Sequence, residues 1–132
     1  MGSVEIDESR WPLVTVRFEG IVDDETFRAY LEGLAGLLRR GESYALLFDA
    51  RHADRTPPVQ RKMQAEWMQA HEAELRRLCV GTAFVITSPL VRGVLTAVLW
   101  ISPMAMPHTV VSTVEEAERW LHASLRANTR VG

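Results

Sequence analysis

Residues 44–50 read Tyr-Ala-Leu-Leu-Phe-Asp-Ala, a short apolar run that ends in a carboxylate, and residues 51–55 read Arg-His-Ala-Asp-Arg. A run of this length with polar residues behind it is typical of a strand that is buried on both faces of a sheet. We therefore expect this stretch to be the central strand, against which the rest of the chain packs.

Two strands and a helix are predicted before the central strand. Val4–Glu8 and Leu13–Glu19 read as strands, and the second of these alternates apolar and polar residues, as expected near a sheet edge. Apolar residues then recur at helical spacing from Phe27 to Leu38. Asp23 is the predicted cap of this helix and Gly41 is its predicted stop.

Three helices and two strands are predicted after the central strand. A helix opens at Thr56-Pro57-Pro58 and runs to Leu78, with Thr56 as its expected cap. Residues 79–87 read as a buried strand, and residues 90–101 are apolar almost all round and are interpreted as a short helix, with a strand as the alternative. Residues 108–111 form the last predicted strand, and a capping box at residues 113–116 opens the last helix.

This alternation predicts an α/β fold in one domain over residues 1–127, followed by a flexible tail at 128–132. We expect a mixed sheet of about five strands, mostly parallel with an antiparallel edge, packed by about four helices. Ligands of such sheets bind outside the carboxyl ends of the strands, where the loops after Ala50, after Thr87 and near Val22 should meet.

Composition excludes several classes of protein. Among 132 residues, 47% are hydrophobic and 24% are charged, and the net charge of −2 gives no basic face for nucleic acid. Cys79 is the only cysteine, so no internal disulfide is possible. The start of the sequence lacks the pattern of a signal peptide, and no apolar stretch approaches the ~20 residues of a membrane span. We expect a cytoplasmic protein.

Several local motifs carry a family resemblance that runs from about Val4 to Leu125. They are Phe18-Glu19-Gly20, Leu47-Phe48-Asp49, Val91-Arg92-Gly93-Val94-Leu95 and Glu116-Ala117-Glu118-Arg119-Trp120-Leu121. With the order of elements, they make the chain resemble the SpoIIAA-like family. These small bacterial domains are related to the anti-sigma-factor antagonist (STAS) fold and loosely to the CRAL-TRIO lipid-transfer domains. The resemblance implies an apolar cavity and dimers.

One departure from this pattern concerns regulation by a kinase. Antagonists that are phosphorylated have a Ser directly after an Asp in the loop before the second helix. Residues 49–56 of this chain contain no such Ser, and Thr56 is assigned to helix capping. A phosphorylation switch would require phosphate on Thr56 or a nearby residue, so the sequence argues against it.

Polar residues at the end of the central strand form one candidate site. Asp49, Arg51 and His52 would supply a small-molecule or acid/base site at the carboxyl edge of the sheet. The alternative is that Asp49 accepts hydrogen bonds from its own loop, which we favour because no nucleophile or metal set accompanies it. His52, His71 and His108 lack the spacing of a metal site, so we expect no metal and no cofactor.

Apolar residues form the stronger candidate. Large apolar side chains and one histidine gather in the second helix and the 90–107 segment, at Trp67, Met68, His71, Trp100, Met104 and Met106. They either fill the core or form a surface for a ligand or a partner, because Met and Trp recur at binding surfaces. The leading hypothesis is a non-enzymatic regulatory domain that homodimerises or binds a protein or an apolar, lipid-like ligand through this surface.

Overall fold

The predicted central strand is β3, Tyr44–Ala53, in the middle of a five-stranded sheet in a computed structural model of the chain. The structure describes residues 2–54, 56–101, 104 and 106–131. Residues 44–47 of β3 are all buried, which confirms the interpretation of this apolar run as a strand covered on both faces.

The sheet is mixed, as expected. Its strand order is β1-β2-β3-β4-β5, with β1 (Ser3–Arg10) antiparallel to β2 (Leu13–Gly20). β4 (Cys79–Val85) and β5 (His108–Val111) continue the sheet in parallel with β2 and β3. The four parallel strands therefore end at one edge, where their loops meet.

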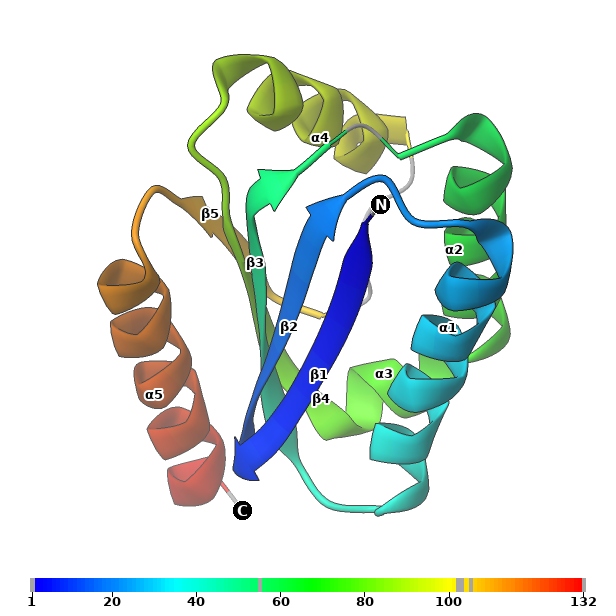
Figure 1. The fold of residues 1–132 in the computed structure, drawn as a ribbon. Coiled ribbons are helices and arrows are strands. Elements are labelled where there is room, and N and C mark those ends of the chain that lie inside the picture. The colour runs from blue at the N-terminus through cyan, green and yellow to red at the C-terminus, as the bar shows by residue number, and fades with distance from the viewer. Residues whose placement is uncertain (1, 55, 102–103, 105, 132) are drawn as a thin grey trace.

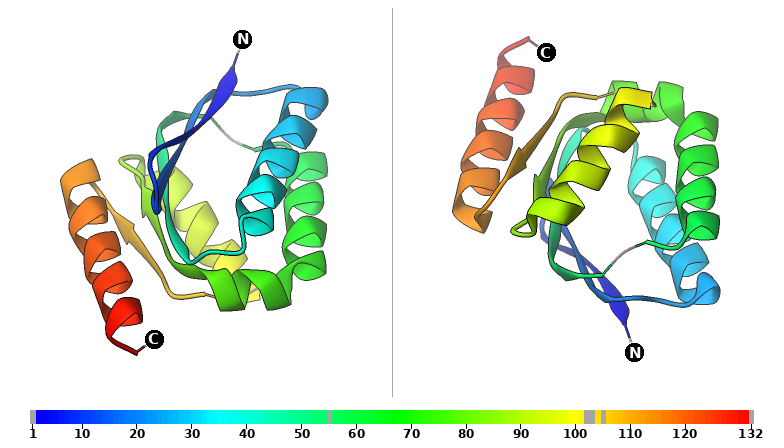
Figure 2. Two further views of the ribbon diagram at one scale, coloured as in Figure 1. Left: turned by 90° about the horizontal axis from the view of Figure 1, so that it is seen from below. Right: turned by 90° about the horizontal axis from the view of Figure 1, so that it is seen from above.

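Helices cover the two faces of the sheet and one end of it. α1 (Asp24–Arg39), α2 (Pro58–Ala70) and α3 (Glu72–Leu78) lie on one side and α5 (Val114–Val131) lies on the other (Figure 1). α4 (Pro89–Ile101) lies at the end of the sheet toward which β2 and β3 point, and the view from above places it between β5 and α2 (Figure 2). The alternative assignment of residues 90–101 to a strand is therefore excluded.

Two apolar cores lie between the sheet and the helices that cover its faces. The larger core joins the face of the sheet that carries Val16 and Leu46 to α1 and α3. The smaller core joins Leu47 and Val85, on the opposite face, to Leu121 of α5. No described side chain of α4 belongs to either core.

Local capping signals in the sequence are confirmed at α1. The Asp23 Oδ1 atom accepts a hydrogen bond from the Thr26 backbone N–H at 2.7 Å, and Gly41 follows the helix with a φ of 69°. A positive φ is readily adopted by glycine, so a helix can end there without strain. α5 runs to Val131, past the predicted start of the tail near residue 128, whose flexibility stays a prediction.

Two details of the predicted helices are wrong. The expected helix from 56 to 78 is divided at His71, whose φ of −112° and ψ of 17° interrupt the helical path. The part of the chain that the structure describes therefore has five helices where about four were expected. The periodicity of apolar residues continues across this break and therefore hides it. Pro57, without a side-chain cap, stands at the start of α2, so Thr56 is not the cap.

Candidate interaction surface

α4 is the most apolar helix of the chain, yet none of its described side chains is buried. The Ser88 hydroxyl accepts a hydrogen bond from the Val91 backbone N–H at 3.3 Å and so caps the start of the helix. The helix carries a single charged residue, Arg92. An apolar helix outside the core is unusual for a water-exposed element, because apolar faces normally pack against another layer.

Five exposed residues of α4 form one continuous stripe, which we call the outer stripe; the exposed Pro89, Arg92 and Thr96 lie outside it. Its members recur at three- and four-residue spacing and are Leu90, Gly93, Val94, Ala97 and Trp100. Leu90 is 78% exposed, Val94 is 46% exposed and Trp100 is 84% exposed. Residues at this spacing lie on one face of a helix. The outer stripe is therefore a single apolar surface that faces water.

The opposite side of α4 is half-buried and borders an open groove. Val91, Leu95 and Leu99 lie on this side. The groove has a volume of about 510 Å³ and lies between α4 and β5, with Thr96, Leu99, Trp100, His108, Thr109 and Val110 lining it. Trp100 thus belongs both to the outer stripe and to the rim of the groove.

The apolar residues singled out from the sequence do not all share one surface. Met106 is buried in the larger core, and Trp67, Met68 and Met104 are half-buried against that core. Trp100 is the one member of the predicted set that is largely exposed.

His71, the remaining predicted residue, is half-buried beside Trp67. The ring centroids of the two side chains are 4.5 Å apart and nearly parallel, at 27°. The His71 Nδ1–H donates to the Trp67 carbonyl oxygen at 2.9 Å. His71 therefore closes the end of α2, which accounts for a histidine in an apolar stripe.

Buried hydrogen bonds hold α2 in place. The Gln60 side-chain amide is buried and donates to the Val22 carbonyl oxygen at 2.8 Å and to the Asp24 carboxylate at 3.0 Å. The Tyr30 hydroxyl donates to Gln64 Oε1 at 3.0 Å, and burial raises the pKa of Tyr30. Because its polar side chains anchor it to α1, α2 is part of the packed body of the protein.

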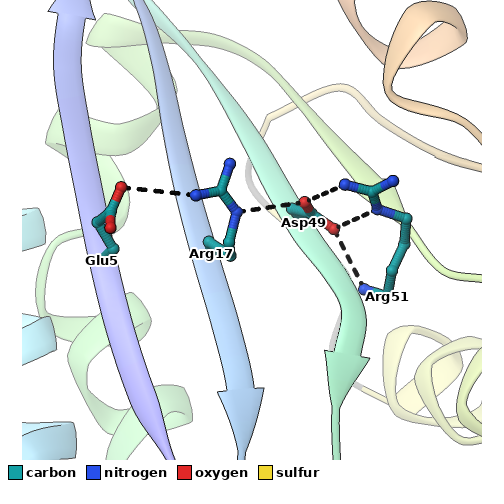
Figure 3. A network of polar contacts seen from close by, with 4 residues as sticks. All are labelled: Glu5, Arg17, Asp49 and Arg51. Carbon is teal, nitrogen blue, oxygen red and sulfur yellow. Dashed lines mark hydrogen bonds and ion pairs between the residues drawn. The ribbon is translucent and has the colours of Figure 1, made fainter.

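Asp49 lies in a ladder of charges across the sheet (Figure 3). Its carboxylate, 2% exposed, accepts two hydrogen bonds from the Arg51 guanidinium, at 2.8 and 2.9 Å, and one from the Arg51 backbone N–H at 3.2 Å. Arg17 Nε lies 3.5 Å from the same carboxylate, and Arg17 Nη1 lies 3.6 Å from Glu5. The Arg51 guanidinium holds the pKa of the Asp49 carboxyl below its ordinary value.

The ladder leaves little support for an acid/base site at this edge. Asp49 is ionised and engaged by two guanidinium groups, a state that suits structural anchoring and is a poor one for accepting a substrate proton. His52 is exposed on the surface of β3. The sequence predicted a loop-organising role for Asp49, but it missed Arg17, because the pairing of Arg17 with Asp49 depends on strand register.

The remaining chemically reactive candidates are inert or exposed. Cys79 is buried, and burial raises the pKa of its thiol. Within the described ranges, no three His, Cys, Asp or Glu side chains gather closely enough to hold a metal ion. Thr56 is exposed and caps no helix, so capping does not account for it. No helix in the described part of the chain is both long and apolar enough to cross a bilayer.

Sequence reasoning named Trp100 but missed the other members of the outer stripe. The signal was present, because residues 90, 93, 94, 97 and 100 follow the spacing of one helical face. The apolar residues between them, such as Val91 and Leu95, concealed which face would point outward.

Comparisons with solved structures place the fold among known ones. A protein of the DUF3478 family from Shewanella loihica PV-4, described as having a SpoIIAA-like fold, is similar with a TM-score of 0.69 and 15% identity, over 91% of this chain and 93% of that one. The anti-sigma factor antagonist SpoIIAA in its unphosphorylated form is similar with a TM-score of 0.65 and 14% identity, over 91% of this chain and 98% of that one. An anti-sigma factor antagonist from Mycobacterium paratuberculosis is similar with a TM-score of 0.60 and 18% identity, over 92% of this chain and 95% of that one.

At this identity the structural likeness concerns the fold alone. A search among curated protein sequences finds no significant match. A family model described as SpoIIAA-like matches residues 13–122, from the start of β2 into α5. Because this match spans most of the sequence, the chain belongs to the SpoIIAA-like family.

Proposed function

We propose that this chain is a regulatory interaction domain without catalytic activity of its own. It binds a protein or an apolar, lipid-like ligand through the outer stripe of α4 and the groove beside it. The observation that carries this proposal is that the most apolar helix of the chain has no buried side chain among those described, while Leu90 and Trp100 are largely exposed.

Leaving the apolar outer stripe in water costs free energy that a partner would recover. Burying apolar surface gains about 25 cal/mol per Å², and a Trp side chain buries about 150–250 Å² when it is covered. Trp is also among the residues that contribute most to binding at protein interfaces. Trp100, 84% exposed at the end of α4, is therefore the proposed anchor of the contact.

The groove favours docking over enclosure of a ligand. Its volume of about 510 Å³ is within the range of small-molecule sites, about 300–1,000 Å³. It is open, however, and such sites bury most of their ligand. A side chain or a segment of a partner protein fits an open groove better than a free lipid does.

The solved relatives support a protein partner. Two of them are described as anti-sigma factor antagonists, whose action is on another protein. For this chain, action through protein contact agrees with the engagement of Asp49 by the Arg51 and Arg17 guanidinium groups.

A paired comparison of variants tests the proposal. Replacing Leu90 and Trp100 together by Ser makes the outer stripe polar, while Ile21→Ser changes an apolar residue that is 42% exposed elsewhere on the surface. We expect the wild type and Ile21→Ser to bind an apolar fluorescent dye or to associate in light scattering, and the double variant to do neither. If the folded double variant binds and associates like the wild type, the proposal is wrong.

A further inference from the structure

We infer that the groove between α4 and β5 takes an extended segment of another protein, which adds a strand to the sheet beside β5. This inference rests on the proposed function and names the chemistry of its partner. The segment carries apolar side chains at alternate positions, which enter the groove, and an acidic residue at the end that lies near Arg92. In recognition of this kind, main-chain hydrogen bonds give affinity and pockets for alternate side chains give specificity.

β5 is an edge strand of the sheet, and β4 is its only neighbour among the described strands. The view from above shows it at the margin of the sheet, with α4 on one side and α5 on the other (Figure 2). The Thr82 N–H donates to the Pro107 carbonyl oxygen at 2.9 Å, and the Ile86 N–H donates to the Val111 carbonyl oxygen at 3.0 Å. Because bonding residues alternate along a parallel strand, residues 107, 109 and 111 direct their main-chain groups toward β4.

The residues between them, His108 and Val110, direct their main-chain groups to the open edge. Each has one N–H and one C=O, so the edge offers two donors and two acceptors. Among the described residues, no main-chain group bonds to these two from outside the sheet. A strand laid along the edge would pair with all four groups.

The groove accounts for the side chains of the added strand. Val110 lines the groove together with Leu99 and Trp100 of α4 and belongs to neither core. Successive side chains of a strand point to opposite faces of the sheet. Every second side chain of the added strand therefore lies on the side of Val110, between β5 and α4. Apolar side chains at these positions would contact Leu99 and Trp100.

The two edges of the sheet differ in their protection against such pairing. β1 carries four charged residues, and its register with β2 shifts between Asp7 and Arg10. Charged side chains and irregular pairing keep further strands away from an edge. β5 has no Asp, Glu, Lys or Arg, and three of its four residues are β-branched, which favours a strand. β5 is therefore the edge that accepts a partner, and its length limits the contact to a short segment.

Charge beside β5 favours an acidic residue in the segment. The Arg92 guanidinium donates to the hydroxyl of Ser112, which directly follows β5, at 3.2 Å and to the Ile86 carbonyl oxygen at 3.4 Å. Within the described ranges, no carboxylate forms an ion pair with Arg92. A guanidinium binds a carboxylate by strong charge-assisted hydrogen bonds. A lipid, by contrast, has no main-chain groups for the edge.

An NMR titration of the full, isotope-labelled chain with methylated peptides tests strand addition. The probe is a short synthetic peptide in which Val alternates with Thr and Glu stands at both ends, and the amide signals of β5 should shift when it binds. Only every second N–H of an added strand faces β5. N-methylation of either all Val or all Thr should therefore weaken binding at least tenfold, and methylation of the other set should change it much less. Equal effects of the two methylation patterns would overturn the inference.

A substitution in β5 tests the same edge from the side of the protein. Val110→Pro removes the N–H that points away from β4, and proline is tolerated in an edge strand where the N–H faces solvent. We expect the dissociation constant of the peptide to rise at least tenfold. Val110→Ile keeps the N–H and the β-branched shape, so this matched control should bind nearly as the wild type does. A folded Val110→Pro protein that binds like the control would contradict strand addition.

Failure of this inference is distinguishable from failure of the proposed function. Suppose that the β5 signals of the wild type do not move at millimolar peptide, while the protein binds the apolar dye through Leu90 and Trp100. Strand addition would then be overturned, and the outer stripe would stand as a contact surface. A wild type that binds neither the peptide nor the dye, and does not associate, would overturn both.

Discussion

α1 and α4 are helices of comparable length with opposite relations to the core. α1 carries Asp24, Glu25, Glu32 and Arg39 among its residues, yet it buries seven side chains. α4 has one charged residue and, among its described side chains, buries none. The arrangement of apolar residues along a helix therefore decides whether the helix is buried, because a helix packs through a stripe that matches a neighbouring layer. The proposed contact surface consists of the apolar residues of α4 that the core does not take up.

The largest expected effect compares the same substitution in the two helices. Leu37 of α1 is 1% exposed, so Leu37→Ala should lower the free energy of unfolding by about 2–5 kcal/mol. Leu90→Ala in α4, measured at a dilution where the chain is monomeric, should change it by less than about 0.5 kcal/mol. Urea unfolding measures both. Similar losses in the two variants would show that α4 packs into the core as α1 does.

Asp49 and His52 show the same contrast between a buried and an exposed position among polar residues. Asp49→Asn removes the charge that the Arg51 and Arg17 guanidinium groups contact. We expect this substitution to lower the free energy of unfolding by about 1–3 kcal/mol at neutral pH. His52→Ala, at an exposed position, should change stability by less than about 0.5 kcal/mol.

The Asp49 carboxylate should also make the stability of the protein fall at low pH. Because the pKa of Asp49 is lower in the folded than in the unfolded chain, its contribution is complete above about pH 4, the ordinary value. It is lost as the pH falls through the lower folded value. Urea midpoints of the wild type should therefore decline more steeply below about pH 4 than those of Asp49→Asn. Parallel curves for the two proteins would rule out the structural role of the carboxylate.

The smallest expected effects have opposite signs at two glycines. A Cβ at Gly81 of β4 would meet Trp120 of α5 at 2.9 Å, and the half-buried Trp120 can shift to relieve part of the clash. Gly81→Ala should therefore lower the free energy of unfolding by about 1 kcal/mol. Gly93→Ala in α4 has open space and gains helix propensity, so it should raise the free energy of unfolding by about 0.5–1 kcal/mol. Thermal unfolding resolves both changes. A destabilised Gly93→Ala would mean that another segment lies against α4.

Local signals explain what the sequence predicted well. The cap at Asp23 and the stop at Gly41 depend on residues within one helical turn, so they are visible without knowledge of the fold. The central strand was predicted because burial on both faces leaves an unbroken apolar run at residues 44–47. These features were sufficient to predict where α1 and the central strand lie along the sequence.

Contacts between distant residues explain what was missed. The Arg17–Asp49 contact joins neighbouring strands, and the hydrogen bond from Gln60 to Val22 joins residues 38 positions apart. The break at His71 falls within a continuous apolar pattern. In α4 the apolar pattern covers almost the whole circumference, so the sequence predicted the helix without showing that its outer stripe faces water.

Hydrogen–deuterium exchange of the full chain tests the central claim, that α4 lies outside the core and leaves its outer stripe to a partner. Amides of α1 should exchange slowly, because the buried side chains of this helix hold it to the sheet. Amides of residues 89–101 should exchange at least several-fold faster, because no described side chain of α4 belongs to either core. Exchange of this segment that is as slow as that of α1 would contradict the account.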